Sequence, residues 1–167
     1  MNEFILIPHN EVTNRQLEQI IEIKSQAWPY SFDSQLHWME ENLKVGDVHA
    51  FSVSNEKIMA YLNLVEIEIK INDVIKNAYG IGNVCAREPG KGWGSEIIRR
   101  TNMYIKQINK IGLLFCKNSL TRFYLLNSWE LIEKDKVRLS FNNEKVETMI
   151  FNYEEDLSSV QYLGKPF

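Results

Sequence analysis

Three glycines fall within five residues in the segment Gly90–Gly94, shortly after an apolar run that ends at Ala86. Glycine has no Cβ, so the backbone can adopt positive φ angles and can approach a ligand closely. Helical spacing follows from Ser95, and the start of a helix offers unpaired N–H groups and the positive end of its dipole. A strand, a glycine loop and a helix start in this order predict an anion site suited to a pyrophosphate.

Two well-known phosphate motifs do not fit this segment. It is not a Walker loop, because Lys91 is followed by Gly92 rather than by Ser or Thr. It is not a dinucleotide fingerprint, because the third glycine comes too soon. A glycine cluster is often only a turn, but its place between a strand and a helix favours phosphate binding.

The composition is that of an ordinary globular protein. The chain has 167 residues, 44% hydrophobic and 25% charged, so we expect one domain over residues 1–167. A formal charge of −3 without a block of Lys and Arg argues against a nucleic-acid partner. No stretch reaches the ~18 apolar residues of a membrane span, and no basic region begins a secretory signal. We therefore expect a cytoplasmic protein with no membrane partner.

Neither metal nor thiol chemistry is indicated. Cys85 and Cys116 form no CxxC pair and lie in separate apolar runs, so we expect reduced thiols in the core. His9, His37 and His49 lack the spacing of metal ligands, and local hydrogen bonding is their expected role. We therefore predict no metal site.

Hydrophobic periodicity predicts seven strands and four helices. Asn10 or Thr13 is expected to cap the first helix, and Ser119 the last. Three of the strands form an antiparallel meander in which Glu66 and Glu68 share an exposed face. The expected strands are 3–7, 48–53, 58–71, 74–86, 111–116, 129–132 and 147–153, and the helices are 11–27, 34–43, 95–108 and 119–126.

This order of elements, together with two motifs, resembles the GNAT superfamily of acyl-CoA-dependent N-acyltransferases over roughly Glu3 to Tyr153. The family's Gln/Arg-x-x-Gly-x-Gly/Ala loop is matched by the segment Pro89–Gly94. Its later Phe-Tyr-x-x-x-Gly-Phe is matched by Phe123-Tyr124 and by Trp129 in place of Phe. The resemblance implies an α/β (α+β) fold with a mixed, mostly antiparallel sheet of six to seven strands flanked by about four helices.

Three positions depart from the family pattern. Pro89 replaces the usual Arg or Gln and has no backbone N–H to donate. Ser128 replaces the customary Gly. Gly80 stands where many members place a glutamate general base. The first departure bears on cofactor affinity, and the third on the identity of the base.

The resemblance implies acetyl-CoA as co-substrate. The backbone of Val84, Cys85 and Ala86 would pair with the pantetheine arm like an added strand. Lys91 would neutralise part of the phosphate charge. The pyrophosphate would be held by the amides of Gly90, Lys91, Gly92, Trp93, Gly94 and Ser95.

Catalysis requires a general acid for the leaving thiolate, and Tyr124 occupies the family's position for that residue. The acceptor must first lose a proton, because a lysine-like amine has a pKa of ~10.4. Positioning of the two substrates is an alternative source of rate. The base is left open among Glu66, Glu68, Tyr79, His49 and the terminal carboxylate, the last if the tail folds back.

The acceptor site is expected at the aromatic segment after the first helix, where Trp28, Tyr30 and Phe32 would contact the substrate, with Glu68 as a further contact. The alternative is that these rings are core residues and Glu68 is simply solvated. Ala60–Ala86 and the ending Leu163–Phe167 also resemble aminoglycoside 2'-N-acetyltransferases, which implies a polar amine acceptor.

We therefore expect an N-acetyltransferase that moves an acetyl or short acyl group to a primary amine of a small molecule or peptide. Two alternatives stay open, namely a catalytically inactive CoA-binding or regulatory module and a small interaction domain without a nucleotide ligand. Pro89 and Gly80 are the features that favour the inactive module. The oligomeric state is open, with a homodimer as one alternative.

Overall fold

The computed structural model describes residues 2–167, which form four α-helices and one sheet of nine strands. The chain divides into two compact units, Met1–Val65 with Gly82–Thr101 and Glu66–Ile81 with Asn102–Phe167. The strands are β1 (Glu3–Pro8), β2 (Val48–Ser54), β3 (Lys57–Ile71), β4 (Val74–Ala86), β5 (Ile111–Cys116), β6 (Glu130–Ile132), β7 (Val137–Leu139), β8 (Glu147–Phe151) and β9 (Val160–Tyr162), and the helices are α1 (Asn14–Ala27), α2 (Phe32–Asn42), α3 (Trp93–Gln107) and α4 (Thr121–Leu126).

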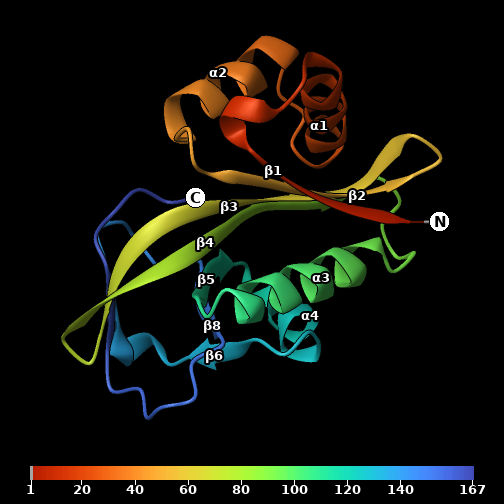
Figure 1. Ribbon diagram of the computed structural model, residues 1–167. Coiled ribbons are helices and arrows are strands. Elements are labelled where there is room, and N and C mark those ends of the chain that lie inside the picture. The colour runs from red at the N-terminus through yellow and green to blue at the C-terminus, as the bar shows by residue number, and fades with distance from the viewer. Residues whose placement is uncertain (1) are drawn as a thin grey trace. The chain divides into compact units, whose positions relative to one another are not determined.

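The first unit is built on an antiparallel meander. β1 pairs with β2 in the register Glu3↔Val53, and β2 pairs with the first part of β3 in the register Val48↔Leu64. Figure 1 shows α1 and α2 on one face of these strands, with the start of α3 on the opposite face. Both faces of the strands are thereby covered, and the core of the unit is fully buried at Ile20, Ile21 and Ile23 of α1, Met39 of α2 and Ala50 and Phe51 of β2.

Side-chain caps fix where α1 and α2 begin. Thr13 forms a capping box with Gln16, in which each side chain accepts a hydrogen bond from the backbone N–H of the other. Thr13 is therefore the correct one of the two expected caps. Ser31 caps α2 by accepting from the N–H of Ser34. The prediction for the start of α2 was two residues late, and Phe32 belongs to the helix instead of the preceding aromatic loop.

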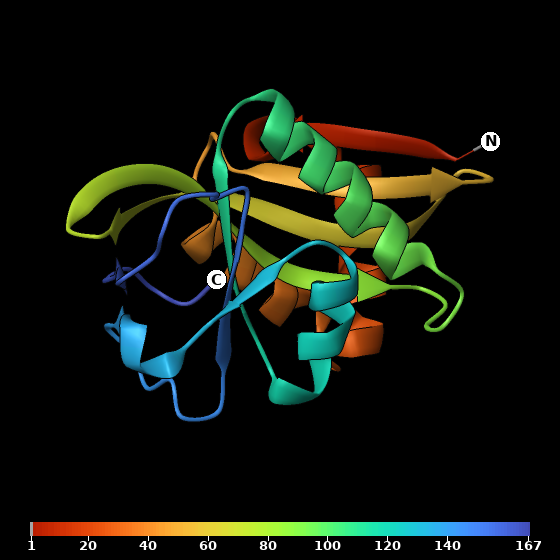
Figure 2. The same ribbon diagram turned by 90° about the horizontal axis from the view of Figure 1, so that it is seen from below.

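The second unit combines parallel and antiparallel pairing. β5 runs parallel to β4, with Gly80 opposite Leu113, and antiparallel to β8, beside which it runs in Figure 2. β6 pairs with β8, while the short strands β7 and β9 pair with each other, and β9 also pairs with the end of β3. The mixed, mostly antiparallel sheet is confirmed. β7 and β9 exceed the expected six to seven strands, because three residues are too few to give a visible alternation.

The structure around α4 shows how the chain accommodates Ser128 and Trp129, which stand where the family motif has Gly and Phe. The last turn of α4 is followed by Ser128 at φ +69°, a left-handed conformation that explains why glycine is customary there. Trp129 is 1% exposed and donates its indole N–H to Asn102 Oδ1 at 3.0 Å. A Cβ at Gly112 would lie 2.7 Å from the Trp129 ring, so this glycine provides the room for Trp in place of Phe. The predicted Ser119 cap was wrong, because a 3₁₀ turn covers Asn118–Leu120 and α4 has no side-chain cap.

The last residues of the chain pack onto β4 within the second unit. Ring atoms of Phe167 lie 2.5–2.7 Å from the place that a Cβ at Gly80 would take, so only glycine fits under the ring. The same ring contacts Phe115 of β5 and Tyr162 of β9, with centroids 5.1 and 5.5 Å apart. The Tyr162 hydroxyl donates to the Lys165 carbonyl at 2.6 Å. The tail therefore folds back, and its aromatic ring fills the space in front of Gly80.

The cysteines, the helices and the possible metal ligands can each be compared with the predictions. Cys85 and Cys116 are buried free thiols, as predicted. Within residues 2–167, no helix has both the length and the apolar character needed to cross a lipid bilayer. The same residues contain no group of three or more His, Cys, Asp or Glu side chains arranged to hold a metal ion.

Replacement of Gly80 by alanine should lower the free energy of unfolding by about 1–3 kcal/mol, because the new methyl group overlaps the Phe167 ring. In a Phe167→Ala background the same change should cost little, so a double-mutant cycle in urea should give a clear coupling energy. Gly46→Ala is the matched control, since a Cβ at Gly46 meets no atom within 4 Å. Additive effects of the two substitutions would contradict the packing described for the tail.

Candidate functional site

The glycine loop of the first unit has the open left-handed geometry that its sequence predicts. Gly90 and Gly92 adopt φ angles of +80° and +87°, and a Cβ built on either would meet no atom within 4 Å. α3 begins directly after the loop, at Trp93. The space in front of both glycines is therefore free for a ligand to approach the backbone.

Three glycine amides at the loop and the start of α3 have no acceptor among the described residues. The N–H of Lys91 donates to the Glu88 carbonyl at 3.4 Å, and the N–H of Glu96 donates to the Gly92 carbonyl at 3.0 Å. Over the described part of the chain, the amides of Gly90, Gly92 and Gly94 have no acceptor. A helix N-terminus with several open donors attracts an anion. Pro89 contributes no donor, so the open amides lie after it.

The strand that leads into the loop is half-buried and tied down at its end. Cys85 is buried, and burial raises the pKa of its thiol to about 12, which makes it an unreactive core residue. The N–H of Arg87 donates to the Met59 carbonyl at 2.8 Å, and its Nε donates to the Ile58 carbonyl at 2.9 Å. Its Nη1 pairs with Glu22 of α1 at 2.6 Å. These contacts hold the first residue of the loop against β3 and α1.

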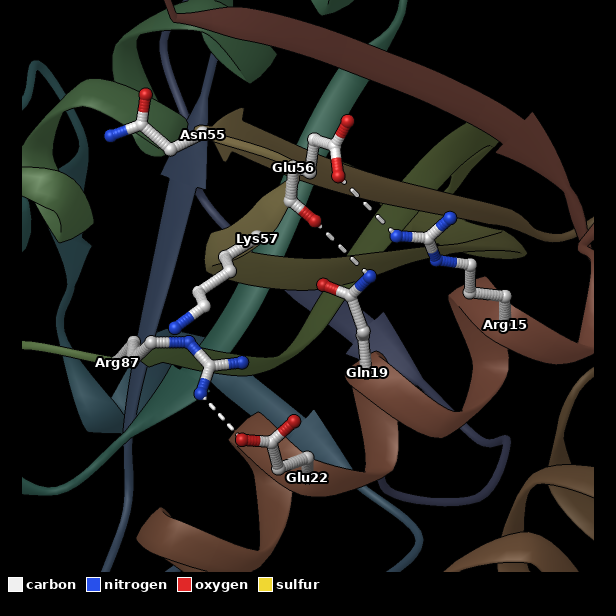
Figure 3. A pocket seen from close by; sticks show the side chains of 7 residues that line it. All are labelled: Arg15, Gln19, Glu22, Asn55, Glu56, Lys57 and Arg87. Atoms are coloured by element: carbon white, nitrogen blue, oxygen red, sulfur yellow. Dashed lines mark hydrogen bonds and ion pairs between the residues drawn. The ribbon is translucent and has the colours of Figure 1, made fainter.

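A charged pocket of about 270 Å³ adjoins this anchor in the first unit (Figure 3). Arg87 donates a hydrogen bond to Glu22. This bond, together with the nearby charges of Arg87 and Lys57, lowers the pKa of the Glu22 carboxyl. The pocket is lined by Arg15, Gln19 and Glu22 of α1, Asn55 and Glu56 of the β2–β3 turn, Lys57 of β3 and Arg87.

A row of buried polar side chains lies on the strands of the first unit. His49 Nδ1 is 2.7 Å from the Tyr61 hydroxyl, and His49 Nε2 is 2.9 Å from His9 Nδ1. Burial, helped by the nearby charges of His9 and Lys24, lowers the pKa of His49 to about 4. His49 is 0% exposed and both ring nitrogens are engaged, so it is not suited to be a direct general base.

Three further polar residues of the first unit, Asn63, Asn83 and Lys24, were not predicted from the sequence. Asn83 of β4 has a φ of +54° and donates from Nδ2 to Asn63 Oδ1 at 2.6 Å. Lys24 is 2% exposed, and its Nζ lies 4.5 Å from the Trp38 ring centroid. Burial lowers the pKa of Lys24 to about 8. The signal for Lys24 was present, since it falls among the apolar positions of α1, whereas nothing local marks Asn63 or Asn83.

Tyr124, the predicted general acid, lies in the second unit on α4. It is 5% exposed, and its ring contacts Phe123 and Trp129. Burial, with a smaller effect of Cys116, raises its pKa well above the usual range. Among residues 2–167 its hydroxyl has no hydrogen-bond partner. It is therefore protonated at neutral pH and able to donate.

The predicted acceptor residues divide between the two units. In the first unit, Trp28 is half-buried, while Tyr30 and Phe32 are 67% and 46% exposed beside it in the chain. The N–H of Tyr30 donates to the Trp28 carbonyl at 2.7 Å. These rings are therefore not surplus core residues. In the second unit Glu68 lies on the exposed face of β3, as expected for a solvated strand face.

Solved structures share this fold. Escherichia coli ElaA is 17% identical with a TM-score of 0.63, and an acyl-CoA N-acyltransferase from Pseudomonas aeruginosa is 14% identical with a TM-score of 0.65. Each match covers 90% of this chain and 99% of the other. An aminoglycoside 6'-N-acetyltransferase, solved with coenzyme A, is 8% identical with a TM-score of 0.67, covering 91% and 99%. The chain has the GNAT fold.

The resemblance seen in the sequence is thus confirmed at the level of the fold. The sequence matches no family model and no curated protein sequence. At identities of 8–17%, the structural similarity establishes the arrangement of elements and leaves residue roles to be argued from this chain.

Acid should destabilise the protein through His49. Its folded pKa of about 4 lies below the unfolded value of ~6.5, so the unfolded chain binds a proton first as the pH falls. This contribution is absent above pH ~6.5 and should reach about 3 kcal/mol near pH 4. Urea unfolding from pH 7 to pH 4 should therefore be less pH-dependent in His49→Gln. His37→Gln, which alters an exposed histidine paired with Glu41, should keep the full dependence. Equal slopes for wild type and His49→Gln would contradict the assignment.

Proposed function

We propose that this chain is an acyl-CoA N-acyltransferase that moves an acetyl or short acyl group to a primary amine of a small molecule or peptide. The observation that carries the proposal is the open glycine loop, with unpaired amides at Gly90, Gly92 and Gly94, at the start of α3 in a chain with the GNAT fold. The prediction that residues 1–167 form one functional domain is part of the proposal, and a cytoplasmic location and a homodimer stay predictions.

Acyl-CoA fits the chemistry of this loop. The amides from Gly90 to Ser95, of which those of Gly90, Gly92 and Gly94 are open, would hold the diphosphate, and Lys91, which is exposed, would neutralise part of its charge. The backbone of Val84, Cys85 and Ala86 would pair with the amide groups of the pantetheine arm. Acyl-CoA then supplies an activated thioester carbonyl for attack by the amine.

Acyl transfer forms a bond from the amine nitrogen to the carbonyl carbon and breaks the C–S bond, so the nitrogen must lose a proton and the sulfur must gain one. The neutral amine attacks the thioester carbonyl, and the sulfur leaves as the C–S bond breaks. Tyr124, held protonated by its raised pKa, would give its proton to that sulfur. Trp28, Tyr30 and Phe32 would contact the acceptor, and Glu68 would attract the protonated amine before it loses its proton.

No single base emerges for the amine. The space in front of Gly80 is filled by Phe167, so β4 offers no carboxylate there. His49 is buried with both nitrogens bonded, and Tyr79 is 7% exposed. Glu66 and Glu68 lie on an exposed strand face. We therefore assign most of the rate to positioning of an amine that loses its proton to water or to one of these carboxylates.

A second candidate function is a CoA-binding module that transfers no acyl group. The packing of Phe167 over Gly80 favours it, because this packing occupies the space in which many GNAT members carry the base. The two candidates differ in turnover and agree in CoA binding.

Acetyl-CoA turnover with a panel of primary amines separates these functions. Release of free thiol that depends on an added amine would support the acyltransferase. Tight CoA binding by calorimetry without thiol release on any amine would favour the binding module. Absence of CoA binding by folded protein would contradict both.

Tyr124→Phe should lower turnover on the order of 10²-fold, the usual effect of losing a general acid, and leave the dissociation constant of CoA unchanged. The phenyl ring keeps the contacts with Phe123 and Trp129, so the fold should be preserved. Thiol release under saturating substrates measures the effect. Unchanged turnover would remove Tyr124 from the mechanism.

Gly92→Val should weaken CoA binding by about 10-fold or more, because a Cβ fills the space in front of the loop and a φ of +87° is strained for valine. Gly46→Val is the control outside the loop, where a Cβ is also in open space. Calorimetric titration with CoA compares the two. Equal affinities for the two variants would show that the loop does not bind the diphosphate.

A further inference from the structure

The charged pocket of the first unit has an unsatisfied positive charge. Its lining carries three cations, Arg15, Lys57 and Arg87, and two carboxylates, Glu22 and Glu56. Glu22 is taken by Arg87 at 2.6 Å. Within residues 2–167, Lys57 Nζ makes no hydrogen bond or ion pair, although it lies near enough to lower the pKa of Glu22. Two cations near a single carboxylate favour a further anion.

The remaining ion pair of the pocket is weak and exchangeable. Arg15 Nη2 lies 3.6 Å from Glu56 Oε2, and the two side chains are 75% and 87% exposed. Exposed pairs of this kind contribute little to stability, so Arg15 can turn from Glu56 to an arriving anion at small cost. Arg87 uses Nε and Nη1 within the protein, and a guanidinium has five N–H donors in all. Lys57, Arg15 and Arg87 can thus all offer donors to one ligand.

The position of the pocket links it to the glycine loop. Arg87 lines the pocket and is only three residues before Gly90, so the Cα atoms of these two residues are at most about 11 Å apart. Both belong to the first unit. In CoA a phosphate monoester sits on the 3'-oxygen of the same ribose whose 5'-oxygen carries the diphosphate. One ligand therefore carries two anionic groups close together, and this unit offers two places that favour an anion, the glycine loop and the charged pocket.

We propose that the pocket of Arg15, Lys57 and Arg87 binds the 3'-phosphate of CoA, while the glycine loop binds the diphosphate. The inference rests on the proposed use of acyl-CoA. It gives the cations a role that the fold itself does not require. Gln19 supports the site from α1, since its Nε2 donates to the Glu56 carbonyl at 3.3 Å and its Oε1 accepts from the N–H of Ile58 at 2.9 Å. These two bonds hold the β2–β3 turn against α1, with Lys57 between the bonded residues.

The test compares CoA with 3'-dephospho-CoA by calorimetry. Wild type should bind CoA about 10- to 100-fold more tightly, the usual effect of charge-assisted hydrogen bonds. In the Arg15→Gln/Lys57→Gln double variant this ratio should fall below about 3, with the affinity for 3'-dephospho-CoA unchanged. Arg87 is left intact because it anchors β4.

Two controls separate the pocket from general electrostatics. Lys44→Gln removes a positive charge from the same unit outside the pocket and should leave the ratio unchanged. Lys91→Gln removes a charge from the glycine loop and should weaken both ligands by the same factor. The proposal would be overturned if wild type bound CoA and 3'-dephospho-CoA equally well, or if the double variant kept the wild-type preference for CoA.

A third arm uses no acyl-CoA, so it separates failure of this inference from failure of the proposed function. Adenosine 3'-phosphate should shift the NMR signals of the Gln19 side-chain amide and of Arg87 Nε–H in wild type, and not in the double variant. Such shifts without any CoA binding would refute the acyltransferase and support a phosphate-monoester site. If wild type shows no shifts, the pocket assignment is wrong.

Discussion

The functional interpretation depends on one backbone constraint, the left-handed conformation of Gly90 and Gly92. At φ near +80° to +90° the N–H groups of both glycines make no bond to the described residues, and the missing side chains leave the space in front of them empty. The start of α3 adds further donors and the positive end of a dipole. Any side chain here would narrow the approach and strain the turn, so the shape of the loop and its proposed binding of an anion depend on the same two glycines.

An open loop is useful only if its ends are fixed, because ordering it on binding would cost conformational entropy. The chain holds one end through Arg87, whose backbone and side chain both bond to β3 and whose guanidinium pairs with α1. The other end continues into a 15-residue helix with buried Ile97 and Ile98. Arg87 thereby has two functions, since the residue that anchors the strand also lines the cationic pocket. Its loss would affect loop order and pocket charge together, which is why the cations that only line the pocket are the more informative ones to change.

Local features of the sequence predicted most of the fold and the loop. The capping box at Thr13, the glycine spacing and the alternation of β3 each depend on a few neighbouring residues. What escaped prediction is non-local. Nothing near Gly80 reveals that Phe167 covers it, and nothing near Trp129 reveals that Gly112 makes its room. The bonds of His49 to His9 and Tyr61 join residues 40 and 12 positions apart. The pocket was not predicted because its seven residues come from α1, a turn, β3 and the position after β4, and only folding brings them together.

The covered position at Gly80 shapes what chemistry is open to this chain. A carboxylate side chain at position 80 would overlap the Phe167 ring, which contacts Phe115 and Tyr162, so the ring would have to move to admit such a base. Under the proposed acyltransferase function, the amine would then lose its proton to another group or arrive already neutral. A dedicated base matters less as the pKa of the acceptor falls towards the ambient pH, because a larger fraction is then ready to attack. Under the proposed function, the packing of Phe167 on Gly80 would therefore favour acceptors of low pKa.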